Sequence, residues 1–127
     1  MQKRILIVED DPGLRGTMSV LLIEQDYEIE TATTVSDIKQ LIKTFKPNLL
    51  LLDTSIGLLN LKWICQNIRL EVIQELLPII LLTAAPVTKE ILYYTNTVCV
   101  IQKPIDVTLF IGQINLSIYS DLRESAY

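Results

Sequence analysis

The sequence predicts one α/β domain built on a five-stranded parallel sheet with helices on both faces. Three observations lead to this fold class. Short apolar runs recur along the chain, segments of helical periodicity separate them, and the connections are short. No internal repeat, linker or low-complexity tract interrupts the 127 residues, which suffice for one hydrophobic core. We therefore expect residues 1–127 to form a single domain.

The first third of the chain gives a strand, a helix and a second strand. Residues 5–8 are consecutive aliphatic side chains, a pattern typical of a strand buried on both faces. The helix that follows has apolar residues at helical spacing, namely Leu14, Met18, Leu21 and Leu22. Residues 27–31 are more polar and are predicted as the second strand.

The middle of the chain repeats this alternation. The second helix is predicted from the apolar positions Ile38, Leu41, Ile42 and Phe45. Residues 49–52 are again a continuous apolar run and form the third predicted strand. The third helix is predicted from Leu61, Ile64, Cys65 and Ile68.

The last third contributes two buried strands, at residues 79–82 and 98–101, with a weaker helical pattern over residues 87–94 between them. The final helix has two apolar faces. The face expected to pack on the sheet contains Val107, Phe110, Ile111, Ile114 and Ile118. The opposite face contains Leu109, Gly112 and Leu116. Together with Tyr93 and Tyr94, this second face is a candidate surface for a homodimer or an effector.

Composition excludes several classes of function. A formal net charge of −4 argues against direct nucleic-acid binding, and the absence of histidine excludes histidine-based catalysis and most zinc sites. Cys65 and Cys99 lack metal-type spacing and are expected as core residues. No apolar run approaches the ~18 residues of a membrane span, so we expect a cytoplasmic protein that does not bind membranes.

Polar residues follow the predicted strands at their carboxyl ends, where open parallel sheets bind ligands. They are Glu9, Asp10 and Asp11 after the first strand, Asp53 after the third, Thr83 after the fourth and Lys103 after the fifth. Asp11 precedes Pro12 and is explained as a helix N-cap. Glu9 and Asp10 have no such structural explanation, and they face Asp53 across the expected edge.

These acids require a compensating cation, because two carboxylates ~4 Å apart repel by about 4 kcal/mol at an effective dielectric of 20. Lys103 supplies one positive charge, and Mg²⁺ is the divalent ion that typically binds one or two carboxylates together with a phosphate oxygen. A carboxylate in such a site can accept a phosphoryl group. Asp53 is the predicted nucleophile, since it is expected between the acidic pair on one side and Thr83 and Lys103 on the other.

The stretches "ILIVEDDP", "NLLLLD", "PIILLTA" and "KP" make the sequence similar to the receiver domain of two-component response regulators over essentially its whole length. The resemblance implies a flavodoxin-like sheet of order 2-1-3-4-5. It implies that a sensor histidine kinase or a histidine phosphotransfer protein donates the phosphoryl group, and that the domain is a phosphoacceptor and not an enzyme in the usual sense.

Residue roles follow from the same resemblance. Asp53 is the implied phosphoacceptor and Asp10 the principal Mg²⁺ carboxylate, with Glu9 assisting and Ser55 contributing its backbone carbonyl. Thr83 and Lys103 are the implied contacts to the phosphoryl oxygens, and the Lys103–Pro104 peptide bond is expected to be cis.

The sequence departs from the family pattern at the fifth strand, where Val100 replaces the usual aromatic residue. We therefore expect phosphorylation to shift the conformation less completely. A receiver fold that serves as a phosphorylation-independent docking module is the main alternative. A Mg²⁺-dependent phosphatase would place its nucleophile in a D-x-D pattern after the first strand, and a flavin carrier would have Ser, Thr and Gly amides there; this chain has neither.

Overall fold

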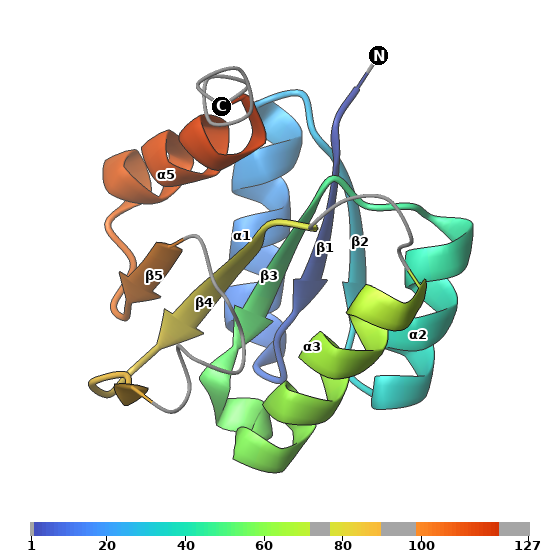
Figure 1. Cartoon of the computed structure of the whole chain (residues 1–127). Coiled ribbons are helices and arrows are strands. Elements are labelled where there is room, and N and C mark those ends of the chain that lie inside the picture. The colour runs from blue at the N-terminus through green and yellow to red at the C-terminus, as the bar shows by residue number, and fades with distance from the viewer. Residues whose placement is uncertain (1, 72–76, 90–98, 120–127) are drawn as a thin grey trace, which may run out of the picture.

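The computed structural model describes residues 2–71, 77–89 and 99–119, and these form one five-stranded parallel sheet (Figure 1). The strand order β2-β1-β3-β4-β5 confirms the predicted topology. The strands are β1 (Arg4–Val8), β2 (Glu28–Ala32), β3 (Leu49–Asp53), β4 (Ile79–Thr83) and β5 (Cys99–Gln102).

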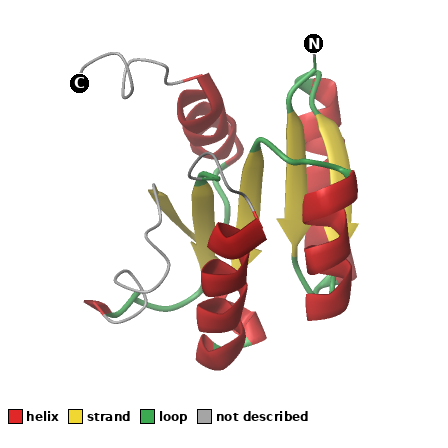
Figure 2. Ribbon diagram, turned by 45° about the vertical axis from the view of Figure 1, so that its right-hand side comes forward, coloured by secondary structure: helices red, strands yellow, loops and turns green. Residues whose placement is uncertain are grey.

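Helices cover both faces of the sheet (Figure 2), as predicted. The described helices are α1 (Pro12–Glu24), α2 (Val35–Thr44), the 3-10 helix η1 (Thr54–Ile56), α3 (Leu58–Glu71) and α5 (Val107–Tyr119). One core layer joins α1 and α5 to one face of the sheet, and a second joins α2 and α3 to the other. Within β1, for example, Leu6 belongs to the second layer, whereas Ile5 and Ile7 belong to the first.

The central strands β1, β3 and β4 are continuous apolar runs because both of their faces are covered. Every residue of β3 and β4 is buried, and in β1 only Arg4 is partly exposed. The prediction that the fifth strand is equally buried was wrong. Only Ile101 of β5 is buried, while Cys99 and Val100 are half-buried, since β5 lies at the edge of the sheet and has one neighbouring strand.

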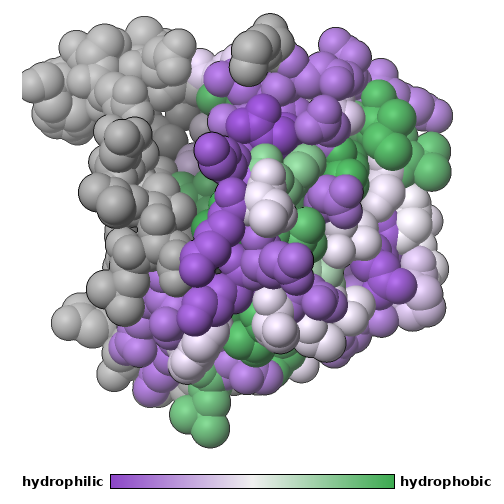
Figure 3. All heavy atoms as spheres, turned by 90° about the vertical axis from the view of Figure 1, so that its right-hand side faces the viewer, coloured by the Kyte–Doolittle hydropathy of each residue, from purple (hydrophilic) through white to green (hydrophobic). Residues whose placement is uncertain are grey.

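The other edge strand, β2, is more polar than the inner strands, as the sequence predicted. Its Glu28 and Glu30 are exposed, and charged side chains on an edge strand oppose pairing with another chain. The face of the molecule that carries α2 is largely hydrophilic, with apolar side chains in small separate groups (Figure 3).

Two predictions for the last third of the chain had different outcomes. Phe110 and Ile114 of α5 are buried against the sheet, but Val107 is 47% exposed because it begins the helix, one turn before its first buried side chain. The helix predicted over residues 87–94 lies largely outside the described residues, as do Tyr93 and Tyr94. No described helix is both long and apolar enough to cross a bilayer.

Candidate functional site

The site residues predicted from the sequence lie at the carboxyl ends of strands, along one edge of the sheet. Asp53 is the last residue of β3 and Thr83 the last of β4, while Glu9 and Lys103 follow β1 and β5 directly. Parallel registers place Val8 beside Leu52, Asp53 beside Leu82 and Thr83 beside Gln102, so the ends of the four strands lie within two residues of one another.

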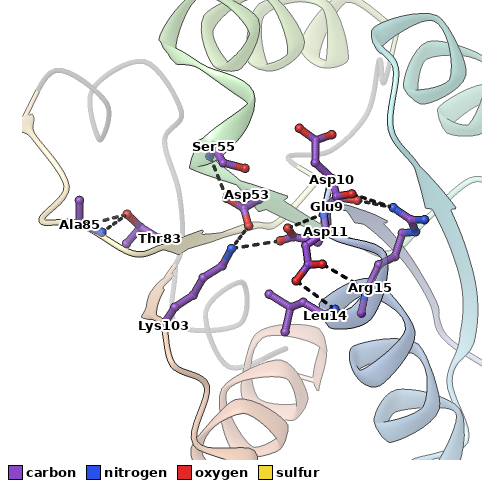
Figure 4. Close-up of polar contacts among 11 residues, drawn as sticks. Glu9, Asp10, Asp11, Leu14, Arg15, Asp53, Ser55, Thr83, Ala85 and Lys103 are labelled. Carbon is purple, nitrogen blue, oxygen red and sulfur yellow. Dashed lines mark hydrogen bonds and ion pairs between the residues drawn. The ribbon is translucent and has the colours of Figure 1, made fainter.

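Lys103 lies between two buried carboxylates (Figure 4). Its Nζ donates a hydrogen bond to Glu9 Oε2 at 3.3 Å and forms an ion pair with Asp53 Oδ2. The side chains of Glu9 and Asp53 are each 2% exposed, and that of Lys103 is 22% exposed. The backbone N–H of Lys103 donates to Thr83 O at 2.7 Å, which fixes the lysine at the strand end.

The pKa values of the three groups reflect this crowding. Burial, followed by the proximity of Asp53, raises the pKa of Glu9 to about 7. Burial also acts to raise the pKa of Asp53, but hydrogen bonds from Glu9, Lys103 and Ser55 outweigh it and hold that pKa below its ordinary value. Burial alone would lower the pKa of Lys103, and the two carboxylates raise it instead. Asp53 is therefore ionised at neutral pH, whereas Glu9 is partly protonated there.

Backbone amides fix the orientation of both acids. The Ser55 N–H donates to Asp53 Oδ1 at 2.8 Å, and the Asp11 N–H donates to Glu9 Oε1 at 3.1 Å. Asp11 itself caps α1, accepting from the Gly13 N–H at 3.2 Å and the Leu14 N–H at 3.4 Å, which confirms its predicted role.

Two predicted site residues keep their side chains away from Asp53. Asp10 is exposed, and Figure 4 shows its carboxylate pointing away from Lys103. The buried Thr83 donates its hydroxyl to Ala85 O at 2.7 Å and accepts from the Ala85 N–H at 3.1 Å, so it is engaged by its own loop.

A metal site of three acids is not assembled in the part of the chain that the structure describes. No three or more His, Cys, Asp or Glu side chains there lie close enough together to hold a metal ion. The donor chemistry nevertheless fits Mg²⁺, which binds carboxylate and carbonyl oxygens. The carboxylates of Glu9 and Asp53 share the Lys103 ammonium group, the backbone of Ser55 is bonded to Asp53 through its N–H, and Asp10 is the residue after Glu9.

Arg15 is a residue of the site that the sequence analysis missed. It lies in the first turn of α1, and its Nη1 donates to the backbone carbonyls of Glu9 at 2.8 Å and Asp10 at 3.4 Å. The sequence signal that could have identified Arg15 was its spacing: it is a cation four residues, or about one helical turn, after Asp11, the last of three consecutive acids.

The peptide bond after Lys103 and the residue three positions before it are as the sequence analysis described them. The Lys103–Pro104 bond is cis. Val100 is half-buried and packs against the core layer that contains α2 and α3.

The two cysteines differ in burial. Cys65 is buried as predicted, whereas Cys99 is only half-buried, and neither forms a disulfide.

The chain matches the family model described as response regulator receiver domain over residues 5–115. Among curated proteins, it is 32% identical over 80 residues to the transcriptional regulatory protein AfsQ1 of Streptomyces coelicolor, covering 63% of this chain and 34% of that protein. It is 35% identical over 66 residues to the uncharacterized transcriptional regulatory protein YvcP of Bacillus subtilis, covering 52% and 28% respectively. The chain thus spans well under half the length of these relatives.

Solved structures with the same fold include a response regulator receiver domain protein (CheY-like) from Methanospirillum hungatei. Its TM-score is 0.83 at 21% identity, and the match covers 98% of this chain and 99% of that one. The chemotaxis protein CheY4 of Vibrio cholerae gives a TM-score of 0.82 at 17% identity, with 92% and 99% covered. At these identities the likeness concerns the fold.

Proposed function

Because the chain belongs to the response regulator receiver domain family, we propose that it is a phosphoacceptor switch in which Asp53 takes a phosphoryl group from a phosphohistidine. The donor would be a sensor histidine kinase or a histidine phosphotransfer protein. The observation that carries the proposal is the position of Asp53, a buried carboxylate at the end of a central strand, held between the Ser55 amide and Lys103.

These contacts suit phosphoryl transfer. Because the pKa of Asp53 is lowered, the carboxylate is ionised and nucleophilic at neutral pH. One of its oxygens attacks phosphorus, the P–N bond to the donor imidazole breaks, and the electron pair leaves with the imidazole nitrogen. Lys103, already within ion-pair distance of Asp53, would neutralise charge on the phosphoryl oxygens.

Mg²⁺ is the proposed cofactor, and it would supply charge neutralisation for the incoming phosphoryl group. The carboxylates of Glu9, Asp10 and Asp53 and the carbonyl of Ser55 would hold it. Thr83 is the proposed hydroxyl donor to the phosphoryl group, which requires its hydroxyl to leave Ala85 O.

The proposed output surface is the exposed face of α5. Leu109 is 65% and Leu116 66% exposed, and both lie on the helix face opposite the buried Phe110. We propose that a second copy or an effector protein binds there. Replacing Leu109 and Leu116 with Glu should weaken self-association or effector binding while leaving Asp53 phosphorylation intact. A native chain that sediments as a monomer with and without phosphoryl donor, combined with unchanged effector binding by the double variant, would refute this surface.

The proposed phosphorylation is tested by incubating the chain with Mg²⁺ and acetyl phosphate and measuring its intact mass. We expect the wild type to gain one phosphoryl group and Asp53→Asn to gain none, because an amide is a poor nucleophile. Asp37→Asn, which changes an exposed acid on α2, serves as the control and should be labelled normally. A wild type that gains no mass would favour the docking-module alternative, which the comparisons do not support.

A further inference from the structure

Arg15 links the two backbone carbonyls of the acidic turn after β1. Its Nη1 donates to Glu9 O at 2.8 Å and to Asp10 O at 3.4 Å, while its own backbone N–H donates to Asp11 O at 2.9 Å (Figure 4). One residue of α1 is therefore bonded to all three residues of the turn. A guanidinium suits this task because it is planar, remains charged and carries several donors in a fixed arrangement.

The contacts of Arg15 differ in kind from those of Lys103. Lys103 binds carboxylate oxygens of Glu9 and Asp53, whereas Arg15 binds carbonyl oxygens of the same turn. Lys103 therefore offsets the carboxylate charges directly, whereas Arg15 fixes the backbone of the turn. Arg15 occupies no carboxylate oxygen in these contacts, which leaves those oxygens available to another cation.

We infer that Arg15 is a positioning residue for Mg²⁺, which holds the peptide units carrying Glu9 and Asp10 so that their carboxylates can serve as ligands. The inference rests on the Mg²⁺ site of the proposed function. Outer contacts that orient metal ligands typically change metal affinity by about 10-fold to 100-fold when they are removed. We expect about a tenfold loss of Mg²⁺ affinity for Arg15→Met, at the lower end because the turn keeps its other hydrogen bonds.

The chain offers a matched control in Arg4, which is also half-buried and donates its Nε to a backbone carbonyl, Lys46 O, at 3.0 Å. Arg4 begins β1 and thus lies at the opposite end of the strand from the acidic turn. Arg4→Met removes the same charge and the same type of hydrogen bond. It should lower stability to a similar extent without changing Mg²⁺ affinity.

The experiment is a backbone amide NMR titration with Mg²⁺ alone, on the wild type, Arg15→Met, Arg15→Lys and Arg4→Met, with urea denaturation of each. We expect wild-type affinity for Arg4→Met, the weakest binding for Arg15→Met and an intermediate value for Arg15→Lys, which keeps the charge but not the planar fork. If Arg15→Met does not fold, the test rests on Arg15→Lys.

Wild-type affinity in the folded Arg15 variants, or an equal loss in Arg4→Met, would overturn the inference while leaving the Mg²⁺ site in place. A wild type whose amides do not respond to Mg²⁺ would overturn the proposed cofactor and, with it, the role of Arg15.

Discussion

Lys103→Met tests the charge balance of the site, because it leaves two buried carboxylates facing each other without their cation. The Lys103 Nζ lies 3.3 Å from Glu9 Oε2 and also forms an ion pair with Asp53 Oδ2. At an effective dielectric of 20, one such pair is worth about 5 kcal/mol of attraction. The variant also removes the cost of burying the lysine, and breaking a buried pair typically costs about 3–5 kcal/mol in total. We expect the free energy of unfolding to fall by about 3 kcal/mol at pH 8.

The loss should depend on pH through Glu9. The folded-state pKa of Glu9, about 7, lies above its ordinary 4.5, so the folded chain binds more protons than the unfolded chain between these values. Wild-type stability from this group therefore decreases as the pH rises from about 4.5 to about 7. At pH 5 Glu9 is protonated in the fold, so Lys103→Met should lose only its pairing with Asp53 and cost less than at pH 8.

The assay is urea denaturation in EDTA at pH 5 and pH 8. Lys39→Met, which removes an exposed lysine of α2, is the control and should stay within about 0.5 kcal/mol of the wild type. The reasoning fails if Lys103→Met is as stable as this control at pH 8, or if its loss of stability is the same at both pH values.

Two further predictions concern the buried Tyr27 and Val100 of β5. Burial, followed by the nearby Tyr119, raises the pKa of Tyr27 to about 12. The free energy of unfolding of the wild type, measured by urea denaturation, should therefore fall as the pH rises from 10 to 12, and that of Tyr27→Phe should change less over the same range. Equal pH dependence of the two chains would contradict this. Because Val100 has no ring to reorient, phosphorylation should leave a mixture of the inactive and the switched conformations. Backbone NMR of the complex with a phosphoryl mimic tests this, and a single fully switched state with large shifts through β5 would contradict it.

The sequence was sufficient for the topology and for the charged residues that meet at the edge of the sheet. Each of these residues follows a strand directly, and parallel strands bring their carboxyl ends together, so Asp53 and Lys103 meet although they lie 50 positions apart. Side-chain orientation was not predictable in the same way. Thr83 bonds its own loop and Asp10 is exposed, since each is set by local rotamers that hydrophobic periodicity does not encode.

Long side chains and sheet edges account for the rest of what the sequence did not predict. Arg15 bonds a carbonyl six residues earlier in the chain, and no periodic pattern marks the target of a flexible cation. The exposure of Cys99 and Val100 follows from the position of β5 at the sheet edge. The apolar run alone is equally compatible with a central strand.

β5, the least buried of the apolar strands, is thus followed directly by Lys103, the cation that pairs with the buried acids. In the described structure, Ile101 is the one buried side chain of β5, while Lys103 at its end is tied to Glu9 and Asp53 of the sheet centre and, through its N–H, to Thr83 O. A charge added at Asp53 would therefore act on a contact that helps to hold β5 in place. Because the helix that follows β5 bears Leu109 and Leu116, the ion pair gives the proposed phosphorylation a direct physical route to the proposed output surface.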